Sequence, residues 1–216
     1  MQRQQRLLAV LAILTLVPMA SGCISLAANL IGAVQGTDRP AEYTGLKGKR
    51  VAVIVATDSG IGADTASAML ASYIQANLKN NVKDIDLVRQ SEVERWVSSR
   101  GQTDGSYLDI GKGVKAEQVV AVEVTNLGLR NGATLYKGHA DLVVSVLDIT
   151  DEGEIMYRKH LPEFTFPKMG GPSVTDTTES KFRGLFLTVV AEKVSGLFYP
   201  VDPTAEVALD ATANSF

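Results

Sequence analysis

The residues with the clearest chemical potential lie near the start of the sequence, around its only cysteine, Cys23. A thiol can be acylated, oxidised or bound to a metal, and its surroundings decide which. The basic residues Arg3 and Arg6 precede the apolar run Leu7–Leu16, and small residues follow at 20–22. A basic start, a short apolar run and small residues before a cleavage point are typical of an export signal. The sequence therefore predicts processing and modification at Cys23.

The stretch Ala20-Ser21-Gly22-Cys23 resembles the lipobox of bacterial lipoproteins, in which the cysteine is acylated and becomes the mature N-terminus. The match holds at Ser21, Gly22 and Cys23, whereas the lipobox prefers leucine in place of Ala20. The resemblance implies a signal peptide that ends at Gly22 and a lipid anchor of palmitate-type acyl chains on Cys23. Ile24, which is not an aspartate, implies the outer membrane, facing the periplasm. The alternatives are a retained signal anchor and a buried cysteine.

The remaining composition excludes several function classes. Removal of the signal takes away Arg3 and Arg6, so 19 of the 21 basic residues remain against 24 acidic ones. No basic surplus remains to attract nucleic acid. With Cys23 lipidated, the folded part has no thiol for a disulfide, a thiolate metal site or a cysteine nucleophile. An apolar content of 45% is enough for one domain with a sizeable core.

A glycine-rich turn, Gly60-Ile61-Gly62, lies between a predicted strand and a predicted helix, where a phosphate could meet a helix N-terminus. The dinucleotide-binding pattern requires another glycine at position 65, which is Thr65, and no P-loop lysine follows. We therefore interpret these glycines as a tight turn and expect no cofactor.

Only two histidines, His139 and His160, are available. Neither has partners at metal-ligand spacing, and no Gly-x-Ser-x-Gly nucleophile motif is present. Acidic pairs lie at strand ends and in turns, at Asp84/Asp86 and Glu152/Glu154. Solvated charge is the ordinary explanation of such pairs. We therefore predict no metal site and no catalytic residues, and expect the protein not to be an enzyme.

One long loop, predicted over Leu161–Thr178, is a candidate binding surface. It contains three prolines, a Gly-Gly pair and the apolar side chains of Phe164, Phe166 and Met169, which we predict to bind a partner protein. Long loops in compact domains are often functional. The alternative is that the aromatic residues fold back and cover the edge of the sheet.

The elements expected to position these residues follow the order β-α-β-α-(short α)-β-β-β-α. The β-branched run "RVAVIVAT" predicts a strand buried on both faces, and Asn131-Gly132 predicts a hairpin turn. A second turn at 151–153 makes the last strands an antiparallel meander, and an apolar helix ends before Pro200. The predicted organisation is a signal peptide, a lipidated tether, one α/β domain and a disordered tail, over residues 1–22, 23–48, 49–200 and 201–216.

This order resembles the anticodon-binding-like α/β domain of the TolB amino-terminal domain, the curli-secretion lipoprotein CsgG and the penicillin-binding-protein activator lipoproteins. The matching stretches are "KRVAVIVAT", "EVERWVSSRG", "VKAEQVVAVEV" and "YKGHADLVVSVLDITDEGEI". The resemblance implies an α/β (α+β) fold, a mixed sheet with an antiparallel meander covered by helices. It also implies a non-catalytic envelope lipoprotein that binds and assists another envelope protein.

Two other functions remain open from the sequence. One is an oligomeric secretion-channel subunit of the curli-secretion type, with further copies of the chain as partners. The other is a periplasmic enzyme or a small-ligand-binding domain. The apolar segment Ile24–Val34 either lies on the membrane or packs on the domain.

Overall fold

The first long strand of the sheet is β1 (Arg50–Thr57). The computed structural model describes residues 38–62, 64–100 and 106–204. Every residue of Val51–Val55 is buried, as predicted for a strand covered on both faces. β1 pairs in parallel with β4 (Gln118–Asn131) and with β3 (Asp86–Leu87), and antiparallel with the short β2 (Gly60–Ile61).

The second half of the sheet is an antiparallel meander of β4, β5 (Leu135–Asp148) and β6 (Glu154–Phe166). Both predicted turns between these strands are confirmed. β6 extends to Phe166, so the prediction that a loop begins at Leu161 is wrong. Pro162 suggested a loop, but a proline is tolerated here because β6 is an edge strand whose pairing is irregular beside it.

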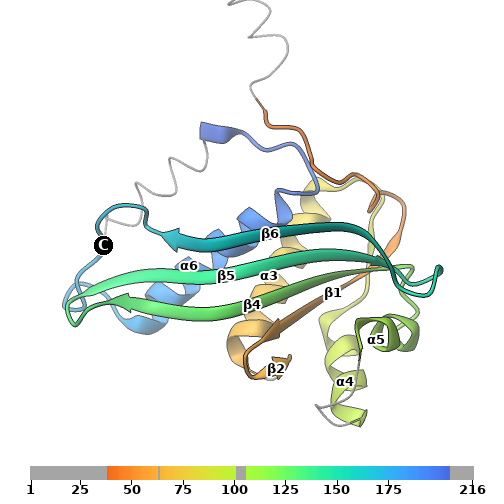
Figure 1. Ribbon diagram of the computed structural model, residues 1–216, viewed down its shortest axis with the longest axis horizontal. Helices are drawn as coiled ribbons and strands as arrows, with labels where there is room; N and C mark the ends of the chain where they lie inside the picture. Colours follow the sequence, from red (N-terminus) through yellow and green to blue (C-terminus); the bar gives the residue numbers. More distant parts are fainter. Residues whose placement is uncertain (1–37, 63, 101–105, 205–216) are drawn as a thin grey trace, which may run out of the picture. The chain divides into compact units, whose positions relative to one another are not determined.

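Helices cover both faces of β1 (Figure 1). On one face lie α3 (Thr65–Asn81) and α6 (Glu179–Ser195), whose buried side chains join those of β4, β5 and β6 in the larger core. On the other face, α4 (Gln90–Arg100) and α5 (Tyr107–Gly113) bury a smaller core against β1 and β4. This mixed α/β arrangement, a six-stranded sheet among the described residues, confirms the predicted fold class.

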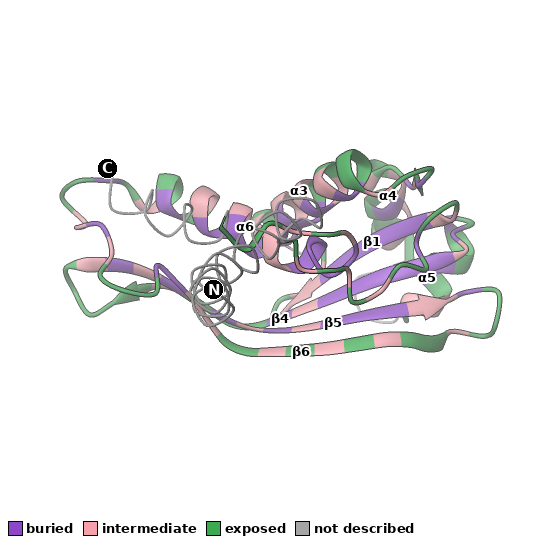
Figure 2. Ribbon diagram, turned by 90° about the horizontal axis from the view of Figure 1, so that it is seen from above, coloured by how far each residue is buried: buried purple, intermediate pink, exposed green. Residues whose placement is uncertain are grey.

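The strands differ in burial because the helices do not cover the whole sheet (Figure 2). In β5, the buried residues Tyr136, Gly138, Ala140, Leu142 and Val144 alternate with less buried ones. This alternation is expected of a strand with one face on a core and the other toward solvent. The part of β5 and β6 beyond α5 therefore presents an uncovered face.

Residues 39–48, at the end of the expected tether, pack against the segment that follows α6 and against β6. The backbone groups of Arg39 and Val201 exchange two hydrogen bonds, at 2.8 and 3.0 Å. The ring of Tyr43 meets those of Tyr157 and Phe198 with centroids 5.6 and 6.3 Å apart. This stretch closes the core between β6 and α6. Within the described residues, no helix has the length and apolar content that a membrane crossing requires.

Candidate docking surface

The loop after β6, residues 167–178, is fixed to the β4–β5 hairpin along its second half. The backbone N–H of Tyr136 donates to the carbonyl of Pro172 (2.9 Å), and the N–H of Val174 donates to the carbonyl of Thr134 (3.0 Å). Thr178 then caps α6 by accepting from the N–H of Lys181. Both ends of this stretch are thus held by regular structure, although the loop has none of its own.

The tip of the loop presents an apolar side chain to solvent. Met169 is 81% exposed, the most exposed large hydrophobic residue in the described part of the chain. Behind it, Gly171 has a φ of 142°, and a Cβ at this position would lie 2.1 Å from the carbonyl oxygen of Tyr136. Only glycine fits this close approach of two backbones. The tip is therefore held by its base, and Met169 projects from it.

The structure separates the three residues predicted to bind a partner. Phe166 is 3% exposed and belongs to the larger core. Phe164 is partly buried, with its ring 6.2 Å from that of Phe186 on α6. Met169 alone of the three lies fully on the surface. The two phenylalanines therefore pack on the larger core, which agrees with the alternative that the aromatic residues fold back onto the sheet.

Asp141 in β5 fixes an irregularity in each neighbouring strand. One carboxylate oxygen accepts from the backbone N–H of Glu163 (2.7 Å), and the other accepts from the side-chain amide of Asn126 (2.6 Å). Both donors have positive φ, 51° at Glu163 and 53° at Asn126. These hydrogen bonds, with a smaller contribution from the nearby His160 and His139, hold the pKa of Asp141 below its ordinary value. Asp141 thus anchors the bends that shape this end of the sheet.

The two histidines lie on neighbouring strands but not opposite each other. His139 pairs with Thr165, and His160 pairs with Val143. Across residues 38–62, 64–100 and 106–204, no set of three or more His, Cys, Asp or Glu side chains is placed to hold a metal ion.

The predicted glycine turn folds β2 back onto the end of β1, with Thr57 opposite Gly60. Beside it, Asp64 caps α3, accepting from the N–H of Ser67 (2.7 Å) and the hydroxyl of Thr57 (2.6 Å). Burial opposes ionisation of Asp64, but these hydrogen bonds outweigh it and lower its pKa. The cavity next to this cap, about 610 Å³, is therefore bordered by a carboxylate where a phosphate would need donors.

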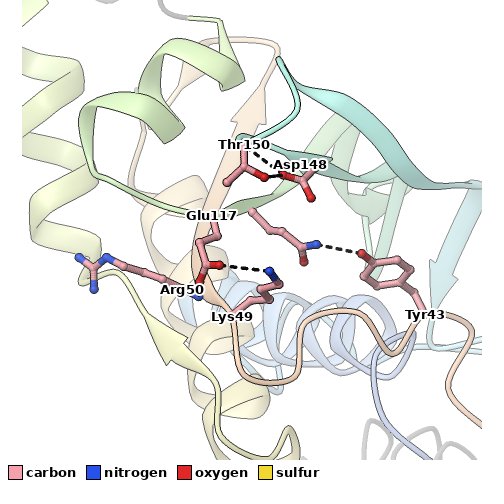
Figure 3. Close-up of polar contacts among 7 residues, drawn as sticks. Tyr43, Lys49, Arg50, Glu117, Asp148 and Thr150 are labelled. Atoms are coloured by element: carbon pink, nitrogen blue, oxygen red, sulfur yellow. Dashed lines mark hydrogen bonds and ion pairs between the residues drawn. The ribbon is translucent and has the colours of Figure 1, made fainter.

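Other polar contacts of the described chain join elements to one another (Figure 3). Glu117, just before β4, accepts from the Lys49 ammonium (3.1 Å) and from the backbone N–H of Arg50 (2.9 Å). The hydrogen bond from Arg50, followed by that from Lys49, lowers the pKa of Glu117. Of the acidic pairs noted in the sequence, Asp86 contacts Arg50 (2.8 Å) and Glu152 contacts Lys112 (3.0 Å). These are ion pairs at the surface, as solvated charge predicts.

Some features of this region were missed by sequence reasoning, and one lies outside the described residues. Tyr136 and Thr134, which hold the loop, gave no signal beyond their place next to the Asn131-Gly132 turn. Ile155 and Met156, 51% and 48% exposed at the start of β6, were read only as strand residues. Cys23 lies outside the described residues.

No protein-family model matches this chain, and no curated protein matches it in sequence. Several solved structures are similar to it. The LpoB C-terminal domain from Salmonella enterica is 15% identical over 56% of this chain and 86% of that chain, with a TM-score of 0.36. A PelC dodecamer from Paraburkholderia phytofirmans is 15% identical over 76% of this chain and 99% of that chain, with a TM-score of 0.43. The lipoprotein GNA1162 from Neisseria meningitidis is 13% identical over 68% of this chain and 98% of that chain, with a TM-score of 0.41. At these values the similarity carries no information on what this chain binds.

Proposed function

We propose that the chain is a non-catalytic lipoprotein of the bacterial envelope. Acylated Cys23 anchors it in the outer membrane, and its α/β domain faces the periplasm and binds another envelope protein. The lipobox-like stretch before Cys23 and the export-signal pattern support the anchor. Each buried methylene contributes about 0.8 kcal/mol, so two or more acyl chains are stable on the membrane.

The observation that carries the binding function is the projecting Met169 on a loop with a fixed base. An exposed apolar side chain on an ordered loop can enter a pocket of a partner without the cost of ordering the loop first. Methionine is also adaptable, because its unbranched side chain fits pockets of irregular shape. The partner surface that suits this tip is an apolar pocket on another envelope protein.

The anchor is tested by Cys23→Ser in the full chain. This change should prevent acylation, so the protein should move from the membrane fraction to the soluble periplasmic fraction. Ser25→Ala is the matched control, since it alters a small residue next to the site and should leave the protein in the membrane. Full membrane retention of Cys23→Ser with an uncleaved N-terminus would contradict the anchor and support a retained signal sequence.

The binding function is tested by chemical crosslinking of intact envelopes, followed by recovery of the tagged chain. We expect one protein to be recovered in a defined ratio with the wild type. Met169→Asp should reduce that recovery about thirtyfold, as expected for loss of an interface residue worth about 2 kcal/mol. Met156→Asp places the same charge on Met156, the other exposed methionine of the described residues, and should retain the partner. Equal recovery from both variants would overturn this function for the loop.

A further inference from the structure

A second feature at this end of the domain is a stretch of β4 that extends beyond its neighbour β1 and therefore has one side without a partner strand. The 14-residue β4 is longer than the eight-residue β1, and their pairing ends at Thr57 and Val124. Beyond this point, residues 125–131 of β4 are paired with β5 on one side only. No other described segment donates a backbone hydrogen bond to them or accepts one from them. This stretch therefore presents unpaired backbone groups to an incoming chain.

A groove runs along this free edge, with a cavity of about 440 Å³, within the usual size range of binding pockets. Leu127 and Leu129 of β4 and Ala66 of α3 form its apolar part. Both leucines are partly buried on the larger core, so part of each is available for contact. The groove thus combines an apolar floor with an unpaired strand, the combination that binds extended peptides in other folds.

The charged residues of the groove are mostly cationic. Glu179, at the first turn of α6, lies between Arg130 (3.2 Å) and Arg183 (2.9 Å), so one carboxylate faces two guanidinium groups. All these side chains are between 42% and 51% exposed. The N-terminal end of α6 adds a partial positive charge. This locally positive groove contrasts with the acidic balance of the whole chain.

His139 adds a hydrogen-bonding group to the same groove because Gly128 has no side chain. The imidazole lies across Gly128, and a Cβ there would lie 2.2 Å from the Cε1 atom of His139. The ring thereby reaches the free edge of β4 from the uncovered face of the sheet.

We propose that this groove binds an extended acidic segment of a partner protein. The segment lies along residues 125–131, places an apolar side chain on Leu127 and Leu129, and directs an Asp or Glu side chain to Arg130 and Arg183. The irregular pairing of β4 in this stretch limits the backbone ladder, so side-chain contacts supply much of the specificity. The site deepens the proposed function by giving the partner a chemical description, but it does not depend on the contact of Met169.

The test is selection of a random decapeptide library displayed on phage. The target is the lipidated full chain in nanodiscs, with empty nanodiscs for counter-selection. We expect the wild type to enrich peptides in which an acidic residue follows or precedes a large apolar one. A fluorescent peptide of the enriched sequence should bind at least tenfold more weakly to Arg183→Glu and to Leu129→Glu. A version of the peptide with Asn or Gln in place of the acidic residue should also bind the wild type at least tenfold more weakly.

Two controls keep the outcome decisive. Arg89→Glu reverses an exposed arginine that is paired with Glu92 in an unrelated helix, and it should bind the peptide like the wild type. Arg183→Gln removes the charge without introducing repulsion, so it should fold normally and bind with intermediate affinity. If no acidic consensus is enriched, or if Arg183→Glu binds as tightly as Arg89→Glu, the proposal is overturned.

The test of the groove can be distinguished from the test of the Met169 contact. Met169→Asp should bind the acidic peptide like the wild type, because the tip is not part of the groove. Failure of the envelope crosslinking with retained peptide selection would reject the Met169 contact alone. Failure of peptide selection with intact crosslinking would reject the groove alone.

Discussion

Two edges of the sheet, the end of β4 and the whole of β6, face solvent in different ways. Residues 125–131 of β4 border a groove with an apolar floor and two arginines. β6 is a complete edge strand, but it has two register shifts, Pro162, and a basic run at 158–160. Bulges, prolines and charges are the devices by which natural sheets prevent unwanted strand pairing. An exposed edge therefore becomes a binding surface only where apolar side chains and matched charges lie beside it.

Both edges are built on the same core, so loss of a core side chain should have the largest effect on the stability of the domain. Phe166, at the end of β6, is buried in the larger core. Phe166→Ala should therefore lower the free energy of unfolding by about 3 to 5 kcal/mol. Met169→Ala, three residues later in the chain and exposed, should change it by no more than about 0.5 kcal/mol. Chemical denaturation of the two variants measures the difference. Similar losses for both would mean that the tip is part of the core.

A smaller effect is expected where β5 meets α6. A Cβ at Gly138 would lie 2.2 Å from the ring of Phe186, so Gly138→Ala should cost about 1 to 3 kcal/mol through overpacking. Gly184 on α6 has no neighbour within 4 Å of such a Cβ. Gly184→Ala should therefore stabilise the domain by up to about 1 kcal/mol, the helix-propensity gain. Thermal unfolding should place the two variants on opposite sides of the wild type.

The bends next to both edges should depend on pH through Asp141. Its pKa in the folded chain is below the ordinary value of 3.8, so the ionised form favours folding. This contribution is complete above the ordinary pKa and is lost as the pH falls through the folded-state value. Asp141→Ala should lower the unfolding midpoint at pH 7, and the difference from the wild type should narrow below about pH 4. Asp141→Asn keeps one acceptor and should lie between them, and a difference independent of pH would contradict this role.

Gly128 offers a change confined to the β4 edge. Gly128→Ala should displace the imidazole of His139, which is the movable end of a side chain, and partly fill the groove. We expect several-fold weaker binding of the acidic peptide, measured by fluorescence anisotropy, with little change in the unfolding midpoint. Unchanged affinity would show that the peptide does not contact this part of the edge.

The smallest effect is expected on the β6 edge. Pro162→Thr restores a backbone N–H and removes one protection against pairing. The free energy of unfolding should change by about 0.5 kcal/mol or less, whereas analytical ultracentrifugation should show a slightly larger oligomer fraction at high concentration. An unchanged oligomer fraction would indicate that the bulges and the basic run prevent strand pairing without Pro162.

Local patterns predicted most of the fold. The β-branched run of β1, the Asn131-Gly132 turn and the apolar spacing of α6 each specify an element through its own residues. The start of β6 was predicted, but its last residues were also assigned to a loop from Leu161, because prolines indicate a loop unless the strand is known to be at an edge. Edge position is a property of the assembled sheet and not of the sequence around the proline.

The candidate sites were less predictable for the same reason. Met169 was recognised from its loop, but the burial of Phe164 and Phe166 follows from α6, which comes later in the chain. Ala66, Leu129 and Arg183 line one groove only because β4 extends beyond the end of β1. That difference in length is visible in the sequence only once the pairing of the two strands is known.

Binding of one envelope protein by the loop and the groove together is tested most directly by a photo-crosslinking amino acid placed singly at Met169, Arg183 and Arg158 in intact envelopes. Met169 belongs to the loop after β6 and Arg183 to the groove. That loop, the turn between β4 and β5 and the start of α6 lie at the same end of the sheet (Figure 1), whereas Arg158 belongs to β6, the protected edge. We predict that Met169 and Arg183 yield an adduct with the same envelope protein, and that Arg158 yields none. An adduct of equal strength at Arg158, or none at Met169 and Arg183, would contradict binding of the partner at this end of the sheet.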